Sequence, residues 1–171
     1  EISCSLVGSE MCIRDSICSV LGLTGLAGGA AVAGCCAQMV GFAVMSFKEN
    51  RWGGLVSQGL GTSMLQIPNL MRKPVLWLPA VAASLVGGPL ATCVFHLEQN
   101  GFAIASGMGT CGLVGPIGVI VGWVNGDGAT AWDIVGLILV AIVVPALVSW
   151  AVSELMRRRG LIKPGDYKLE L

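Results

Sequence analysis

The chain has 171 residues, of which 54% are hydrophobic and only 12% charged, and its formal net charge is zero. A soluble domain carries about 25% charged residues, so this composition excludes an ordinary soluble globule, and the neutral balance excludes an electrostatic case for nucleic-acid binding. The seven cysteines form no C-x-x-C pair and a single histidine cannot complete a zinc site, so no metal or other cofactor is expected.

The first sixteen residues, EISCSLVGSEMCIRDS, differ from the rest of the chain. They do not begin with Met, show no periodicity and lack the basic start and cleavage pattern of a signal peptide. They resemble the translated sequencing-adapter peptide that contaminates the ends of assembled contigs. We therefore interpret residues 1–16 as a disordered artefact, the alternative being a genuine short polar N-terminus.

The remaining chain contains five long stretches without Asp, Glu, Lys or Arg. Each is at least 20 residues long: 16–47, 52–71, 74–97, 99–126 and 134–153. A helix of about 20 mostly apolar residues crosses the hydrocarbon core of a bilayer, and a central charge would cost about 2.5–3.5 kcal/mol. The pattern predicts an all-α, polytopic integral membrane protein.

The first predicted span, residues 17–47, is rich in Gly and Ala, which lets helices approach one another closely. It is long for a single span. The helix is therefore expected to be tilted, or to be broken near Gly28–Gly29.

Two further stretches predict ordinary spans. Residues 75–95 form one, which Pro79 and Pro89 are expected to kink. Residues 132–153 form the other, and residues 157–171 follow as a polar cytoplasmic tail.

The two other stretches, 52–71 and 99–126, contain similar sequence motifs, which we call the Gly–Thr phrases. GLGTSMLQIPNL covers residues 59–70 and GMGTCGLVGPIG covers residues 107–118, with Gly, Gly, Thr, Leu and Pro at matching positions. Glycine and proline break helices, and a break at membrane depth frees backbone groups that only protein or a watery cavity can satisfy. Paired broken segments build the central sites of some transporters.

The charges around these stretches predict their topology. Basic residues flank 52–71 on both sides, whereas the flanks of 99–126 carry acidic residues and no Lys or Arg. Cytoplasmic loops collect Lys and Arg, so each stretch is predicted to start and end on one side, as a re-entrant hairpin. The alternative is that both are spanning helices packed through small residues, which would put Arg72 and Lys73 on the outer side.

Four strings in order carry a family resemblance: GGAAVAGCCAQMVGFAVMSFKEN, GGLVSQGLGTSMLQIPNL, GPLATCVF and SGMGTCGLVGPIG. They resemble the EIIC family of the bacterial phosphotransferase system, and within it the perfringolysin-regulator-like branch. The resemblance covers about residues 28–161. Family members are longer, so residues 17–156 are expected to be the C-terminal portion of an EIIC-like transmembrane domain.

The resemblance implies a function and partners. EIIC proteins are multi-pass proteins of the bacterial inner membrane that bind a sugar and present it to the phosphorylated EIIB protein. It thus implies a sugar permease, EIIB and EIIA as partners, the lipid bilayer as environment, a homodimer, and phosphotransferase activity only together with EIIB. The alternatives are a membrane regulator or sensor that keeps the fold without phosphotransfer, and a structural scaffold.

Polar side chains inside the apolar stretches are the candidates for sugar contacts, because buried polar groups are costly unless hydrogen-bonded. They are Gln38, Thr62, Ser63, Gln66, Asn69, Ser106 and Thr110. The alternative is that they bond neighbouring helices. Because related EIIC sites use one His and one Glu, His96 and Glu98 are the catalytic candidates, with Glu98 as proton acceptor; the alternative is a solvated loop.

Overall fold

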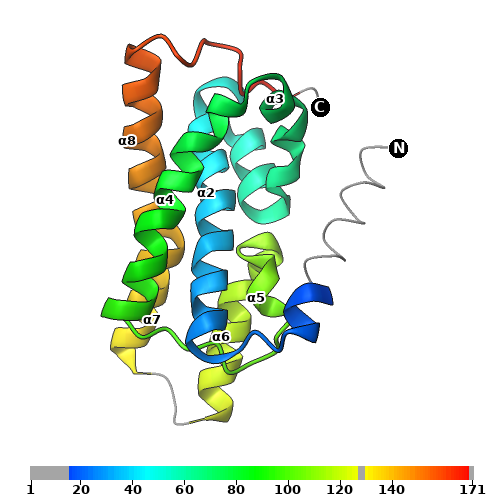
Figure 1. Ribbon diagram of the computed structural model, residues 1–171, viewed down its shortest axis with the longest axis vertical. Coiled ribbons are helices and arrows are strands. Elements are labelled where there is room, and N and C mark those ends of the chain that lie inside the picture. The colour runs from blue at the N-terminus through cyan, green and yellow to red at the C-terminus, as the bar shows by residue number, and fades with distance from the viewer. Residues whose placement is uncertain (1–15, 127–129, 170–171) are drawn as a thin grey trace.

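The computed structural model describes residues 16–126 and 130–169, so the segment interpreted as an artefact, residues 1–16, lies outside the described residues except for Ser16, which is helical. Three long helical segments pack side by side, and two shorter broken segments lie against one face of this bundle (Figure 1).

Helix α2 (Gly25–Val56) is the centre of the bundle. It follows an irregular stretch at residues 21–24, and it is not broken at Gly28–Gly29. Both glycines are buried, and a Cβ atom on Gly29 would overlap the carbonyl oxygen of Leu97. These glycines therefore permit a close approach of the 97–99 loop rather than a break in the helix.

The helix reverses at Arg51, whose backbone is non-helical with φ 49° and ψ −141°. The straight part, residues 25–50, is about 39 Å long, enough to cross a bilayer. After Arg51 the chain runs back along α2, so that the Gln58 amide donates a hydrogen bond of 3.0 Å to the Ser46 hydroxyl. The elements that follow are η1 (Ser57–Gly61), η2 (Ser63–Gln66) and α3 (Ile67–Arg72).

A second long segment then returns to the Gly25 end of the bundle. It comprises η3 (Pro74–Trp77), α4 (Leu78–Pro89) and η4 (Leu90–Val94). Both prolines predicted to kink it lie at changes of geometry: the 3₁₀ turn gives way to α-helix beside Pro79, and α-helix gives way to a π-helical turn after Pro89.

The chain re-enters the bundle at Gln99, which exchanges two backbone hydrogen bonds with Gly25, at 2.8 and 2.9 Å. The next elements are α5 (Ala105–Met108), η5 (Cys111–Leu113) and α6 (Val114–Asn125). The last long segment comprises α7 (Ala131–Ile138), η6 (Leu139–Val143) and α8 (Val144–Arg158).

The C-terminal residues 160–169, the C-terminal clasp, pack against the end of the bundle opposite Gly25. The Tyr167 side chain is fully buried, and Ile162 and Leu169 are nearly so. An ion pair of 2.6 Å joins Lys73 to Asp166. The clasp connects α8 to the end of α3 across the top of Figure 1.

Large apolar side chains cover the outer faces of the long helices. Trp77, Leu85, Trp150 and Leu155 are each more than half exposed. Such faces would aggregate in water but are suited to lipid. Within residues 16–126 and 130–169, three helical segments are long and apolar enough to cross a membrane: Gly25–Gly61, Pro74–Val94 and Ala131–Arg158. The chain is therefore an all-α membrane protein, as the composition predicted.

Candidate functional site

The two Gly–Thr phrases form the same local structures in the same order. In each, a short helical arm ends at or next to the glycine before the threonine, a 3₁₀ turn follows, and an α-helix leads away; the first arm is π-helical and the second α-helical. Thr62 is extended at the first break, and Gly109 has a φ of 56° at the second. The repeated sequence motif therefore corresponds to a repeated local arrangement of helix, break, 3₁₀ turn and helix.

The first of these segments starts and ends at the same end of the bundle. The Asn50 amide at its start donates a hydrogen bond of 2.7 Å to the Tyr167 carbonyl, and the Asn69 amide near its end donates one of 3.0 Å to the Lys168 carbonyl. Because Tyr167 and Lys168 are adjacent, both ends of the segment contact the same short stretch of the C-terminal clasp. We call this the basic end, because Lys and Arg gather there.

The second segment starts and ends at the opposite end. Gln99, at its start, pairs with Gly25. Gly122, near its end, lies so close to Asn100 that a Cβ atom on it would be 2.8 Å from the Asn100 carbonyl carbon. Both segments therefore turn back inside the bundle, one from each end.

The turning points of the two segments meet beside α2. The Thr110 hydroxyl donates a hydrogen bond of 2.7 Å to the Gly59 carbonyl, which joins the two phrases directly. A Cβ atom on Gly109 would lie 2.7 Å from the Cys35 carbonyl carbon and 2.9 Å from the Cys36 nitrogen, so this turn approaches α2 as only glycine allows.

A cavity of about 370 Å³, the tip cavity, lies beside this meeting point, where Cys35 of α2 both lines the cavity and contacts the Gly109 turn. Its polar side chains come from the first break, the second segment and two long helices. The lining residues are Ile17, Cys18, Ala31, Gly34, Cys35, Gln38, Met39, Ser63, Ser84, Ser106 and Gly107.

Three predicted sugar contacts line this cavity: Gln38, Ser63 and Ser106. The Gln38 amide donates a hydrogen bond of 3.3 Å to the Ser84 hydroxyl, and the Ser106 hydroxyl donates one of 2.7 Å to the Leu23 carbonyl. The half-buried Ser63 hydroxyl has no partner among residues 16–126 and 130–169. Ser63 is thus the lining side chain with its full hydrogen-bonding capacity left for a ligand.

The other predicted contacts are engaged elsewhere. The Thr62 hydroxyl accepts a hydrogen bond from the Met64 amide, and the Thr110 hydroxyl is held by Gly59. The Gln66 amide donates to the Tyr167 carbonyl at 3.0 Å and its oxygen accepts from Asn69. The structure thus brings Gln66 and Asn69 to the C-terminal clasp and not to the tip cavity.

His96 and Glu98 lie in an exposed loop at the Gly25 end. His96 has a φ of 45°, and the Glu98 carboxylate accepts a hydrogen bond of 3.2 Å from the Asn100 amide. Neither residue lines the tip cavity. The structure does not bring the two predicted catalytic side chains to the predicted sugar contacts.

Ser84, Cys18 and Cys35 line the cavity but were not singled out in the sequence. Ser84 was detectable in principle, as a polar residue in the otherwise apolar span 75–95. The two cysteines had no distinguishing signal, because cysteine is also common as a small core residue.

The polar side chains that line the cavity are uncharged groups. Among the described residues that line it, these groups are three serine hydroxyls, one glutamine amide and two cysteine thiols, with no carboxylate, imidazole, ammonium or guanidinium. Such groups can donate hydrogen bonds to a neutral hydroxylated molecule and accept them from it.

The fold places the chain among all-α membrane proteins. The model of one protein family, "Phosphotransferase system, EIIC", matches residues 16–169, and the chain belongs to this family. Comparison with curated proteins and with solved structures found no match. Membership in the family supports a permease component of the phosphotransferase system, and it implies a sugar substrate and association with EIIB and EIIA.

Proposed function

We propose that this chain is the membrane permease component of a phosphoenolpyruvate-dependent sugar phosphotransferase system, and that it binds its sugar in the tip cavity. The observation that carries the proposal is the meeting of the two Gly–Thr turns beside a neutral, hydroxyl-lined cavity of about 370 Å³. Ligand pockets are usually about 300–1,000 Å³, so a cavity of this size suits a small sugar.

The membrane topology follows from the charges. From residue 74 to residue 156 the sequence has no Lys or Arg, whereas the basic end carries Lys48, Arg51, Arg72 and Arg157–Arg159. Lys and Arg favour the cytoplasmic side, so we place the basic end and residues 157–171 in the cytoplasm. The protein is then a multi-pass protein of the bacterial inner membrane, with residues 17–156 as its transmembrane domain.

With this placement the two Gly–Thr segments are re-entrant hairpins that enter the bilayer from opposite faces. A hydrogen bond between the two hairpins, from the Thr110 hydroxyl to the Gly59 carbonyl, is the kind of polar contact that satisfies backbone groups freed at a break. EIIB, charged with phosphate by EIIA, would approach the basic end, because phosphate donors are cytoplasmic.

The direct test is sugar binding to the purified full chain in lipid nanodiscs, measured by calorimetry with a panel of hexoses, hexitols and disaccharides. We expect one sugar class to bind, and Ser63→Ala to weaken its affinity about fivefold, the equivalent of one hydrogen bond. The matched control is Ser57→Ala in the same re-entrant segment, whose hydroxyl bonds the Gly54 carbonyl and does not line the cavity.

Further measurements distinguish a transport function from a regulatory one. The larger change Ser63→Trp should abolish binding by filling the cavity, and full affinity in that variant would overturn the site. A sugar that binds but is not phosphorylated on addition of EIIB, EIIA and phosphoenolpyruvate would favour a regulator or sensor. The absence of binding by any sugar of the panel would refute the proposal.

A further inference from the structure

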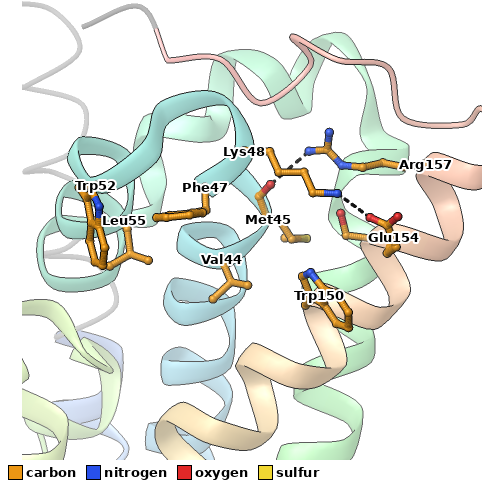
Figure 2. A pocket seen from close by; sticks show the side chains of 10 residues that line it. Val44, Met45, Phe47, Lys48, Trp52, Leu55, Trp150, Glu154 and Arg157 are labelled. Carbon is orange, nitrogen blue, oxygen red and sulfur yellow. Dashed lines mark hydrogen bonds and ion pairs between the residues drawn. The ribbon is translucent and has the colours of Figure 1, made fainter.

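A second cavity, of about 320 Å³, lies at the basic end between α2 and α8, and we call it the basic-end cavity (Figure 2). It shares no lining residue with the tip cavity. The residues that line it are Val44, Met45, Phe47, Lys48, Trp52, Leu55, Trp150, Ser153, Glu154 and Arg157.

The walls of this cavity are aromatic and aliphatic. Phe47, Trp52 and Leu55 form one side, Trp150 lies on the other, and Val44 lies between them (Figure 2). Trp52 is 71% exposed and Trp150 is 54% exposed, so neither ring is buried by the protein's own side chains. An apolar partner that covered them would remove a large hydrophobic area from water.

The polarity changes along the cavity. Lys48, Glu154 and Arg157 gather at its outer end, whereas Val44 and Trp150 lie one helical turn deeper (Figure 2). One turn is about 5.4 Å along the helix axis. The cavity is therefore charged at its mouth and apolar within. This arrangement is complementary to an amphiphile that has a charged head and an apolar chain.

The charges at the mouth leave an excess of positive charge. The lining residues Lys48 and Glu154 pair at 2.7 Å, and Arg157 pairs with Glu49 at 3.2 Å. Arg158 does not line the cavity, but it reaches Glu154 at 3.6 Å and so lies next to the mouth. Among the described residues of this network, three basic groups less two carboxylates leave one net positive charge. Glu154 is the only carboxylate paired with Lys48 and Arg158 in the described part of the chain, so two positive charges share one negative charge. A bound anion would supply a second negative charge to this group.

We propose that the basic-end cavity binds an anionic phospholipid, with an acyl chain between Trp52 and Trp150 and its phosphate at Lys48 and Arg158. Tryptophan gathers at the membrane interface, and basic pockets between membrane helices bind acidic headgroups. A sugar is a poor occupant, because apolar walls would leave its hydroxyls unpaired. The proposal rests on the membrane placement of the basic end, and it does not depend on sugar binding.

The test uses the full chain, delipidated in detergent and titrated with dioleoyl phosphatidylglycerol or dioleoyl phosphatidylcholine. Binding is followed by quenching of tryptophan fluorescence with brominated acyl chains and by the thermal unfolding midpoint. We expect the anionic lipid to bind at least fivefold more tightly than the neutral one. Each basic group near a lipid surface contributes about a fivefold factor, so Lys48→Gln with Arg158→Gln should largely remove the preference.

Matched controls lie at the same end of the bundle. Trp77 is 54% exposed, as Trp150 is, but does not line the cavity, so Trp150→Leu should reduce quenching more than Trp77→Leu. Arg72 is exposed and makes no ion pair within the described part of the chain, so Arg72→Gln should leave the lipid preference unchanged.

Three results would overturn the proposal. The first is equal affinity of the wild-type chain for the two lipids, a result that does not depend on whether any variant folds. An equal loss in Arg72→Gln would show diffuse attraction to the whole basic end. Crosslinks from Trp52→Cys to a second copy in lipid-saturated protein would show that another protomer fills the cavity. Loss of sugar binding with retained lipid selectivity would refute only the proposed transport function.

Discussion

The Thr110 hydroxyl donates a 2.7 Å hydrogen bond to the Gly59 carbonyl, although the two residues are 51 positions apart in the sequence. The bond joins the turning points of two segments that start from opposite ends of the bundle. It also satisfies a carbonyl at the π-helical turn that ends the first arm, where regular helical bonding stops.

Thr110→Val should therefore destabilise the fold. The substitution keeps the shape of the side chain but leaves the Gly59 carbonyl unpaired, at a cost of about 1–3 kcal/mol. Reversible unfolding in mixed micelles measures the change. Thr92→Val is the matched control, because its hydroxyl bonds the Gly88 carbonyl within the same helical segment and should matter by less than about 0.5 kcal/mol. Equal effects in the two variants would contradict a special role for the Thr110–Gly59 bond.

Gly29→Ala should be among the most damaging single-methyl additions. A Cβ atom there would overlap the Leu97 carbonyl oxygen, which belongs to backbone and cannot rotate away. We expect a loss of about 1–3 kcal/mol in the free energy of unfolding. Gly34→Ala, on the same helix, has nothing within 4 Å of the added atom and should be neutral or slightly stabilising. A neutral Gly29→Ala would mean that the 97–99 loop does not pack on α2 in this way.

Cysteine labelling tests the topology of the two Gly–Thr segments. In a background without the native cysteines, Arg51→Cys and Arg72→Cys should react with a membrane-impermeant maleimide from one face of the membrane. Asn100→Cys and Asn125→Cys should react from the other, because all four side chains are exposed at the ends described above. Labelling of positions 51 and 72 from opposite faces would mean that residues 52–71 span the bilayer.

The C-terminal clasp should loosen in acid. Partial burial would raise the pKa of Asp166, but the ion pair with Lys73 and the bond from the Lys163 amide outweigh it and hold that pKa below its usual value. A lowered pKa in the folded state stabilises the clasp above the unfolded value of about 3.9, and this contribution is lost as the pH falls through the folded value.

The mobility of a spin label at position 168 measures this effect. It should rise below about pH 4 in the wild-type chain, whereas Asp166→Asn should make the label mobile at neutral pH and remove the acid step. Asp133→Asn, at the opposite end of the bundle, is the control and should leave the label unaffected. An acid step that survived in Asp166→Asn would assign it to another group.

The helical membrane class could be predicted from the sequence, because a helix in lipid satisfies its own backbone and needs only a long uncharged run. The family could also be recognised, because strings such as GGLVSQGLGTSMLQIPNL are characteristic sequence motifs that can be read without a structure. The break expected at Gly28–Gly29 was wrong, since glycine in a helix can equally permit close packing, and sequence alone does not distinguish the two uses.

Only the tertiary structure decided how the polar side chains are used. Gln66 and Ser63 lie three residues apart in one phrase, yet Gln66 bonds to Tyr167, 101 residues away, while Ser63 lines the tip cavity. Sequence marks such residues as polar groups that require partners in an apolar environment. Which partner each finds depends on segments brought together from distant parts of the chain, because a hydrogen bond acts over about 3 Å and only packing sets distances on that scale.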